Sequence, residues 1–252
     1  MLKREKLGLK YYAFASLERY PQLVHAVLTR HSPEGSDWTF SSSSPENKPE
    51  QVLQNFKVVE KALKLSPLIY LGQEHGDKCL IIPPSQQTDY SHIKAHQGYD
   101  AVIGFPGQSL MIRVADCQGA IIFDPQSQML ALVHSGWRGS VKNILGQTIA
   151  LLKDRFSLEP KNFLAAFAPS LGACCGEFIH YQRELPQSFT AFMTEKPFHF
   201  DFPAISRYQL VQAGMREENI EFSGLCTKCS PDFYSYRRGD TGRFAVVAGV
   251  VN

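Results

Sequence analysis

Three residues able to bind a metal ion each follow an apolar run that is typical of a β-strand. His75 lies in the segment QEHG, Cys117 in ADC and His134 in HSGWRG. Reactive groups are often placed at strand ends, because the strand is rigid and the loop beyond it is open. Two imidazoles and one thiolate suit zinc and leave a fourth position for water or a substrate. The residue types therefore indicate a candidate metal site.

The spacing of these residues leaves a second interpretation open. The spacing is wider than in compact zinc motifs. The competing explanation for these three residues is a buried cysteine and two strand-end histidines packed in a core without a metal. A metal-bound histidine needs an acceptor for its other ring nitrogen. Glu74 and Asp116 are the candidate acceptors, since each precedes a possible ligand.

Two further segments are rich in basic side chains. The motif GWRG at 136–139 opens a predicted helix, where backbone N–H groups and Arg138 could bind an anion. A tight turn with a solvated arginine is the alternative. The loop at 236–243, with the sequence YRRGDTGR, holds three arginines, Arg237, Arg238 and Arg243. We expect it to be a surface loop with paired charges.

The remaining cysteines form two close pairs in the sequence. Cys226 and Cys229 make a CxxC motif, which lacks a second CxxC to complete a structural zinc site. We expect a structural or reduced pair, with an accessory metal or redox role as the alternative. Cys174 and Cys175 are neighbours, which predicts packing in a turn, because adjacent cysteines rarely reach good disulfide geometry.

Short apolar runs, which are typical of strands, and amphipathic helical patterns must position these residues. Strands are expected at 68–71, 80–82, 101–103, 110–114, 120–123, 130–134, 163–167 and 244–251. Apolar residues spaced for one helix face predict helices at 50–65, 139–153, 185–193 and 205–215. The polar segment at 31–48 is expected to be an exposed loop. Strands and helices alternate without a regular rhythm and no linker divides the chain, so we expect one α+β domain with mixed sheets.

Composition excludes several classes of protein. The net charge of +2 is too balanced for a nucleic-acid-binding stripe. No apolar run approaches the roughly 20 residues of a membrane span, and no apolar segment follows the basic start, so neither a membrane protein nor a secretory signal is expected. The cysteine content is not that of a disulfide scaffold. We therefore expect a cytoplasmic protein.

Several motifs occur in one order and closely resemble those of the laccase-domain, or polyphenol-oxidase, family, whose members are regarded as purine nucleoside phosphorylases. The resemblance runs from about His25 to the C-terminus and is most specific between Ala115 and Gly139. The motifs are QEHG at 73–76, ADC at 115–117, HSGWRG at 134–139, APSLGACC at 168–175, CTKC at 226–229, SYRR at 235–238 and TGR at 241–243.

The resemblance implies a fold, a metal and a set of reactions. The fold is a single α+β domain, here 1–252, with mixed sheets flanked by helices. The family's metal ligands fall on His75, Cys117 and His134. The implied metal is zinc, and copper has also been attached to the family. The implied reactions are phosphorolysis of adenosine, inosine, guanosine and methylthioadenosine, and deamination of adenosine. Arg138 is then the candidate phosphate ligand, and Asp116 a candidate base or orienting group.

The chain also departs from the family pattern near its N-terminal third. SPEG at 32–35 replaces a double glycine, a serine run at 41–44 replaces a Ser-x-Asn-Leu block, and Asn55 lacks the arginine that usually follows it. If this region lines the substrate pocket, substrate range or activity changes. Three alternatives therefore stay open: a hydrolase using Cys117 and His134, a copper-dependent polyphenol oxidase, and a non-catalytic nucleoside-binding relative.

Overall fold

The strands of the protein form two mixed sheets. The computed structural model describes residues 1–41, 48–84 and 96–251. In spatial order, the first sheet contains β1 (Leu2–Lys6), β2 (Leu9–Ala13), β3 (Leu23–Leu28), β13 (Phe244–Val250), β8 (Ser109–Val114), β4 (Leu68–Gly72) and β6 (His96–Gln97). The second contains β12 (Ile220–Phe222), β11 (Leu164–Phe167), β9 (Gln118–Phe123), β10 (Leu130–Ser135), β7 (Ala101–Gly104) and β5 (Cys79–Ile81).

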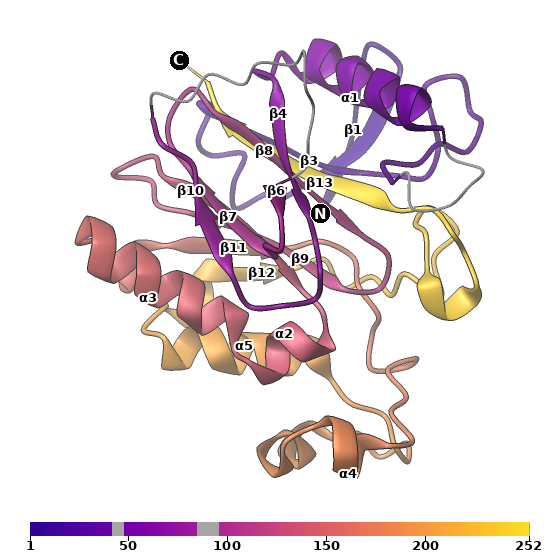
Figure 1. Ribbon diagram of the computed structural model, residues 1–252, viewed down its shortest axis with the longest axis vertical. Coiled ribbons are helices and arrows are strands. Elements are labelled where there is room, and N and C mark those ends of the chain that lie inside the picture. The colour runs from indigo at the N-terminus through magenta and orange to yellow at the C-terminus, as the bar shows by residue number, and fades with distance from the viewer. Residues whose placement is uncertain (42–47, 85–95, 252) are drawn as a thin grey trace.

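Helices cover the outer faces of the two sheets. The α-helices are α1 (Pro49–Leu63), α2 (Trp137–Val141), α3 (Ile144–Phe156), α4 (Tyr181–Glu184) and α5 (Phe202–Gln212). The 3₁₀ turns are Pro160–Asn162, Gln187–Phe192, Glu217–Asn219 and Tyr236–Arg238. Figure 1 shows α1 on one side of the strands and α2, α3 and α5 on the other. The predicted α+β class, with mixed sheets flanked by helices, is confirmed.

Alternating side chains along each strand divide the core into layers. On β10, Leu130 and Leu132 join the cluster between the two sheets, whereas Ala131 and Val133 face the cluster that contains α3 and α5. This follows from the two-residue period of a strand. A third cluster packs α1 against the first sheet. Apolar strands buried on both faces therefore hold the site-bearing loops between rigid layers.

Most of the predicted elements are present, and several boundaries differ. The helix expected at 139–153 is two helices, α2 and α3. They are separated at Asn143, which has a φ of 58° and accepts a hydrogen bond from the N–H of Gly146. The pattern at 185–193 forms a 3₁₀ turn rather than an α-helix. Strands β1, β2, β6 and β12 were not predicted, because strands of two to five residues offer too few positions to show a hydrophobic period.

The prediction of an exposed loop at 31–48 is wrong for its central part. Trp38 and Phe40 are buried and pack in the cluster under α1. The side chain of Asn55 donates a hydrogen bond of 2.8 Å to the carbonyl of Thr39 and so fixes this segment to α1. Most of the serine run, residues 42–44, lies outside the described residues.

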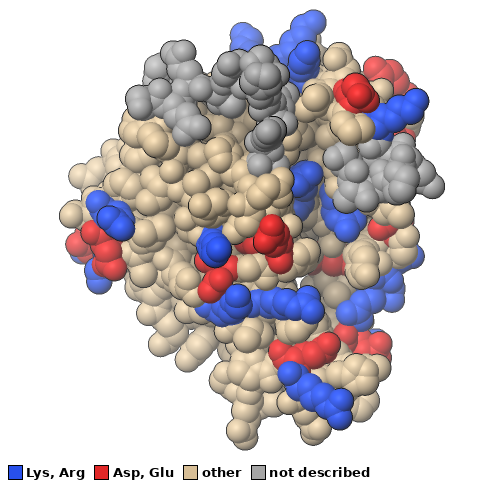
Figure 2. Space-filling model, in the orientation of Figure 1, with Lys and Arg blue, Asp and Glu red and all other residues tan. Residues whose placement is uncertain are grey.

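The surface of the molecule carries charges of both signs. Figure 2 shows basic and acidic side chains interspersed on one face, without a continuous positive stripe. Among the residues with described positions, no helix has both the length and the apolar character that crossing a membrane requires.

Candidate metal centre

The three predicted ligands come from two sheets and meet where the chain passes between them. His75 follows β4 and His134 lies on β10, whereas Cys117 lies in the connection from β8 in the first sheet to β9 in the second. Because β9 and β10 are antiparallel, with Gly119 opposite His134, Cys117 is brought to the end of β10. The topology therefore joins residues that are far apart in the sequence.

The ligand atoms of these three residues lie within 4.8 Å of one another. The rings of His75 and His134 are 4.9 Å apart between centroids and nearly perpendicular, at 79°. His134 is buried, Cys117 is half-buried and His75 is exposed. One side of the group is thus open to solvent, and the other is fixed in the core.

Asp100, directly before β7, organises the group and was not identified from the sequence. Its fully buried carboxylate lies 2.8 Å from Nδ1 of His134. It also accepts hydrogen bonds from the backbone N–H groups of Glu74, His75 and Gly76. The bond to His134 leaves Nε2 as the nitrogen available to a metal. This is the orienting role that the sequence suggested for Asp116 or Glu74.

The loops that carry the candidate ligands have left-handed backbone conformations. The φ angle is 60° at His75 and 81° at Asp116, next to Cys117. Residues with a side chain rarely adopt such angles, and they cluster at functional sites. The three backbone bonds to Asp100 hold the first of these turns. The Gln73 side chain, which exchanges two hydrogen bonds with the backbone of Arg113, ties the same loop to β8.

The ionisation of Cys117 and His134 is coupled. Burial alone would raise the pKa of Cys117, but the charge of His134 and hydrogen bonds from both histidines outweigh it and lower this pKa to about 6. Burial would likewise lower the pKa of His134, whereas Cys117 and Asp100 together raise it to about 9. Without a metal, the pair is therefore held as a thiolate and an imidazolium.

Gly136 lies against the side chains of two candidate ligands. A Cβ atom there would lie 2.9 Å from Cδ2 of His75 and 3.2 Å from Sγ of Cys117. The first distance is shorter than a non-bonded contact between carbon atoms, and the second is tight for carbon and sulfur. Glycine at this position therefore makes room for the side chains of the site.

Arg138 and Asp116, the two candidate functional residues beside the ligands, have different surroundings. Arg138 is exposed on α2, with its guanidinium 4.2 Å from the centre of the Trp137 ring. The Asp116 carboxylate accepts one hydrogen bond from the hydroxyl of Thr227, at 2.5 Å, and one from the N–H of Arg237, at 2.6 Å. Arg138 is thus free to meet an anion, while Asp116 holds the C-terminal loop against the site.

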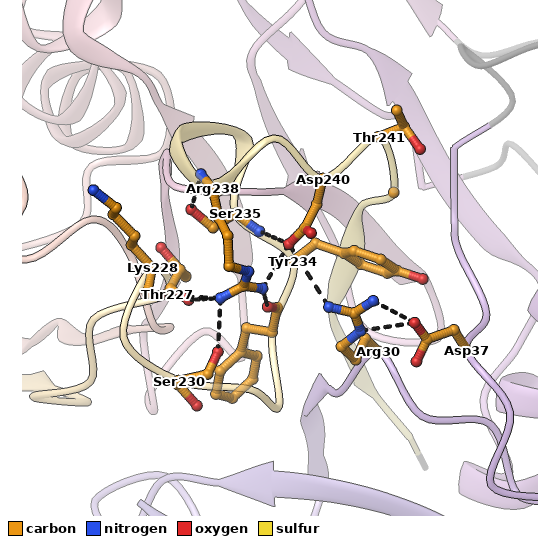
Figure 3. A network of polar contacts seen from close by, with 12 residues as sticks. Arg30, Asp37, Thr227, Lys228, Ser230, Tyr234, Ser235, Arg238, Asp240 and Thr241 are labelled. Atoms are coloured by element: carbon orange, nitrogen blue, oxygen red, sulfur yellow. Dashed lines mark hydrogen bonds and ion pairs between the residues drawn. The ribbon is translucent and has the colours of Figure 1, made fainter.

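The arginine-rich C-terminal loop is a structural element with paired charges, as predicted. Arg238 forms an ion pair with Asp240 and donates hydrogen bonds to backbone carbonyls (Figure 3). Arg30, from the N-terminal part of the chain, pairs with Asp37 and Asp240 in the same network.

The donor set fits a divalent metal ion. Two imidazoles and one thiolate are ligands of catalytic zinc sites and also of single copper sites. Multi-copper chemistry requires several centres with many histidines. Among the described residues, the His75 group is the one candidate cluster that contains histidine, and the other consists of cysteines. A single metal ion therefore fits these residues, and a multi-copper centre does not.

Comparison with known proteins supports a relationship over nearly the whole chain. The family described as multi-copper polyphenol oxidoreductase laccase matches residues 28–251. A purine nucleoside phosphorylase from Bacteroides thetaiotaomicron is 25% identical over 260 residues, which cover 94% of each chain. Purine nucleoside phosphorylase YlmD from Bacillus subtilis is 31% identical over 151 residues, covering 56% of this chain and 54% of that protein.

Solved structures share the fold. The crystal structure of YlmD from Geobacillus stearothermophilus matches with a TM-score of 0.85 at 22% identity, covering 99% of this chain and 98% of that one. A Bacillus licheniformis protein, YfiH, matches with a TM-score of 0.83 at 24% identity and covers 98% of each chain.

Proposed function

The chain belongs to the multi-copper polyphenol oxidoreductase laccase family, and on that premise we propose that it is a zinc-dependent purine nucleoside phosphorylase. The relatives compared above carry the name purine nucleoside phosphorylase. The proposed substrates are inorganic phosphate and adenosine, inosine, guanosine or methylthioadenosine. Free thiols, such as those of all six cysteines here, suit the reducing cytoplasm that we propose as its location.

The observation that carries the proposal is the convergence of His75, Cys117 and His134. Their ligand atoms lie within 4.8 Å, and Asp100 orients His134 by a hydrogen bond of 2.8 Å. Three protein ligands with an open fourth position are typical of catalytic rather than structural zinc. A zinc ion bound there would act as a Lewis acid toward an anionic or polar substrate oxygen.

In the proposed reaction, a phosphate oxygen forms a bond to C1′ of the ribose as the bond between C1′ and the purine nitrogen breaks. The bonding electrons leave with the purine, which takes up a proton, and ribose 1-phosphate is formed. Phosphate must therefore be held close to C1′, and a proton must be delivered to the leaving base.

Arg138 is the proposed phosphate ligand. Its guanidinium is exposed and is stacked on Trp137 at 4.2 Å, so the side chain is ordered without being neutralised by that contact. A guanidinium can bind two phosphate oxygens at once. A Cβ atom at Gly136, two residues earlier, would lie 2.9 Å from Cδ2 of His75 and 3.2 Å from Sγ of Cys117, and this closeness supports a role for the segment at the site.

Asp116 is the proposed base or orienting group. Both of its carboxylate oxygens already accept hydrogen bonds, from Thr227 and from the backbone of Arg237. These bonds fix the position of the residue that precedes Cys117. The orienting role therefore has direct support in its contacts, and a proton-transfer role would act through the same carboxylate.

We also propose adenosine deamination at the same site. In that reaction a water oxygen bonds to C6 of the purine and the amino group leaves as ammonia, giving inosine. The same ligands, His75, Cys117 and His134, would serve this reaction. Both reactions require a polar substrate group or a water to be held at the open fourth position of a metal ion.

A Cys–His hydrolase is a second candidate, and one observation favours it. Cys117, His134 and Asp100 form a line of nucleophile, base and orienting carboxylate, and the pKa of Cys117 is lowered to about 6, chiefly because His134 outweighs the opposing effect of burial. Activated cysteines in hydrolases have such partners. The two candidates differ in whether Cys117 binds a metal or reacts itself.

The test begins with protein purified without added metal or chelator. Zinc is measured by elemental analysis in the wild type, in Cys117→Ala and in Cys79→Ala, a control cysteine on β5 outside the site. Each protein is then incubated with adenosine in the presence and absence of phosphate. We expect adenine and ribose 1-phosphate only with phosphate, loss of both in Cys117→Ala, and full activity in Cys79→Ala.

Other outcomes point elsewhere. A wild type that contains no zinc at the His75 group, keeps its fold and is modified at Cys117 by a thiol alkylator would favour the hydrolase. A zinc-containing wild type that binds adenosine without turnover would indicate a non-catalytic relative. A wild type that contains copper in place of zinc and oxidises phenols would favour the alternative of a copper-dependent polyphenol oxidase.

A further inference from the structure

Four cysteines that are paired in the sequence come together at one place on the surface. Cys174 and Cys175 lie in one turn, and Cys226 and Cys229 in another. All four sulfur atoms lie within 4.8 Å of one another. We call these residues the four-cysteine cluster. The sequence assigned the first pair to turn packing and left the second without partners, so the structure changes the interpretation of both.

The sheet explains why the two pairs meet. Strands β11 and β12 are parallel neighbours, so the segments that follow them leave the same edge of the second sheet. These segments continue side by side, because Ser170 forms a parallel bridge with Cys226 and the N–H of Thr227 donates to the carbonyl of Ser170 at 3.0 Å. The turns that carry the cysteines are therefore built on paired backbone.

We propose that the four-cysteine cluster is a second metal site, which binds one structural zinc ion through four thiolates. The sulfur of Cys229 lies 3.8 Å from that of Cys174 and 3.6 Å from that of Cys175. Zinc–sulfur bonds of about 2.3 Å in a tetrahedron place the sulfur atoms about 3.8 Å apart. These two separations match that edge, and all four thiols are free.

Local groups around the cluster also suit a tetrathiolate. A Cβ atom at Gly172 would lie 3.1 Å from Cβ of Cys226 and 3.5 Å from Sγ of Cys174, so glycine permits the close approach of the two turns. Lys196, whose ammonium donates to the carbonyl of Cys174 at 3.3 Å, brings positive charge to the negatively charged complex.

The position of the cluster suggests what the ion would stabilise. The second turn carries Thr227, whose hydroxyl binds Asp116 next to Cys117. The guanidinium of Arg238 donates hydrogen bonds to the carbonyls of the same turn (Figure 3). The acceptors are Thr227, Lys228 and Ser230, at 3.0, 3.1 and 3.1 Å. A zinc ion would cross-link the two turns and so support the loop that carries Cys117.

The first test measures zinc per chain in four proteins purified in reducing buffer after loading with zinc chloride. They are the wild type, Cys117→Ala, the double variant Cys226→Ser/Cys229→Ser and the control Cys79→Ala. With two sites of one ion each, we expect about two zinc ions in the wild type and the control. Each of the other two proteins is expected to retain about one. A double variant with the zinc content of the wild type would overturn the proposal.

A second test needs no variant, and it covers the case in which the double variant fails to fold. Zinc-loaded wild-type protein is treated with a thiol alkylator before and after addition of a chelator, and the modified peptides are mapped by mass spectrometry. Cys174 and Cys229 are exposed, so they should react readily unless a metal shields them. We expect all four cysteines to be protected until the chelator is added. Immediate reaction, or a disulfide within the cluster, would overturn the proposal.

Cobalt distinguishes this site from the His75 group. Cys117→Ala, stripped of zinc and loaded with cobalt, is expected to show the strong visible and charge-transfer absorption of tetrahedral cobalt thiolate. The absence of these bands would contradict a four-thiolate site. None of these readouts depends on nucleoside turnover, so a failure of the proposed enzyme activity and a failure of this site would be seen separately.

Discussion

Asp100 is the residue around which the candidate centre is built. It is fully buried, and its carboxylate accepts hydrogen bonds from three successive backbone N–H groups and faces the His134 ring. A buried carboxylate with so many partners stays ionised, because each bond favours the charged form. One side chain thus fixes both the left-handed turn at His75 and the orientation of His134.

Replacing Asp100 should therefore weaken metal binding. In Asp100→Asn one oxygen becomes an NH₂ group, which meets backbone donors instead of accepting from them. We expect zinc affinity to fall about 10–100-fold, as for other partners of metal-bound histidines. Competition with a chelating dye measures the affinity for zinc. The matched control is Asp124→Asn, a buried aspartate that accepts a hydrogen bond from the N–H of Ser127 in a turn after β9, and unchanged affinity in Asp100→Asn would contradict this role.

Gly136→Ala tests the packing of the ligands directly. The added methyl would lie 2.9 Å from the His75 ring and 3.2 Å from Sγ of Cys117, so at least one ligand must move. The φ of Gly136 is −76°, which alanine adopts without strain, so the fold should persist. We expect zinc content to fall while the unfolding temperature of the metal-free protein changes little. Full zinc occupancy in the variant would show that the site has more space than the structure gives it.

At the scale of elements, strand β3 carries a buried titratable group that links stability to pH. Nε2 of His25 accepts a hydrogen bond of 2.9 Å from the N–H of Phe14, and this bond joins β3 to the residue that follows β2. Burial lowers the pKa of His25, partly offset by the nearby carboxylates of Glu18 and Glu221. The folded protein therefore prefers the neutral imidazole.

The sign of the pH effect follows from this shift. Above the unfolded pKa of about 6.5 the histidine is neutral in both states, and its stabilising contribution is complete. As pH falls below that value, the unfolded chain binds the proton first, so the free energy of unfolding decreases by at most about 1.4 kcal/mol per pH unit. Urea unfolding of Cys117→Ala between pH 7.5 and 5.5 measures it without the metal at the His75 group. His25→Gln in the same background should lose less stability over this range, and an equal loss would assign the effect to other groups.

The whole molecule depends on the layer between the two sheets. Phe123 at the end of β9 is fully buried there, and its ring centre lies 5.4 Å from that of Tyr20. Side chains from both sheets fill this layer, so a cavity in it would lower the stability of the entire fold. The assignment of 1–252 to one domain is a prediction that unfolding experiments can check.

Phe123→Ala should destabilise the protein by about 3–5 kcal/mol, because it removes buried apolar surface and leaves a cavity. The control Tyr236→Ala removes an aromatic ring that is 72% exposed and should cost less than about 1 kcal/mol. Circular dichroism and tryptophan fluorescence should report one coincident transition for a single domain. Two separated transitions would show that the chain contains independent folding units.

The sequence by itself determined the elements whose patterns are local. Apolar periodicity located α1 and most central strands, and the strand ends together with the ordered motifs selected His75, Cys117 and His134. These signals depend on neighbouring residues, so they are visible without a fold. The burial of Trp38 and Phe40 was not predictable, because their partners lie on α1 and the first sheet.

Only the tertiary structure decided which distant groups meet. Asp100 belongs to none of the sequence motifs, and its role follows from the pairing of β7 with β10. The two cysteine pairs meet because β11 and β12 are parallel neighbours, and β12 was not expected at all. Strand pairing depends on the summed packing of both sheets rather than on any short segment. The sequence could therefore name the candidate metal ligands, whereas their orientation and the four-cysteine cluster required the fold.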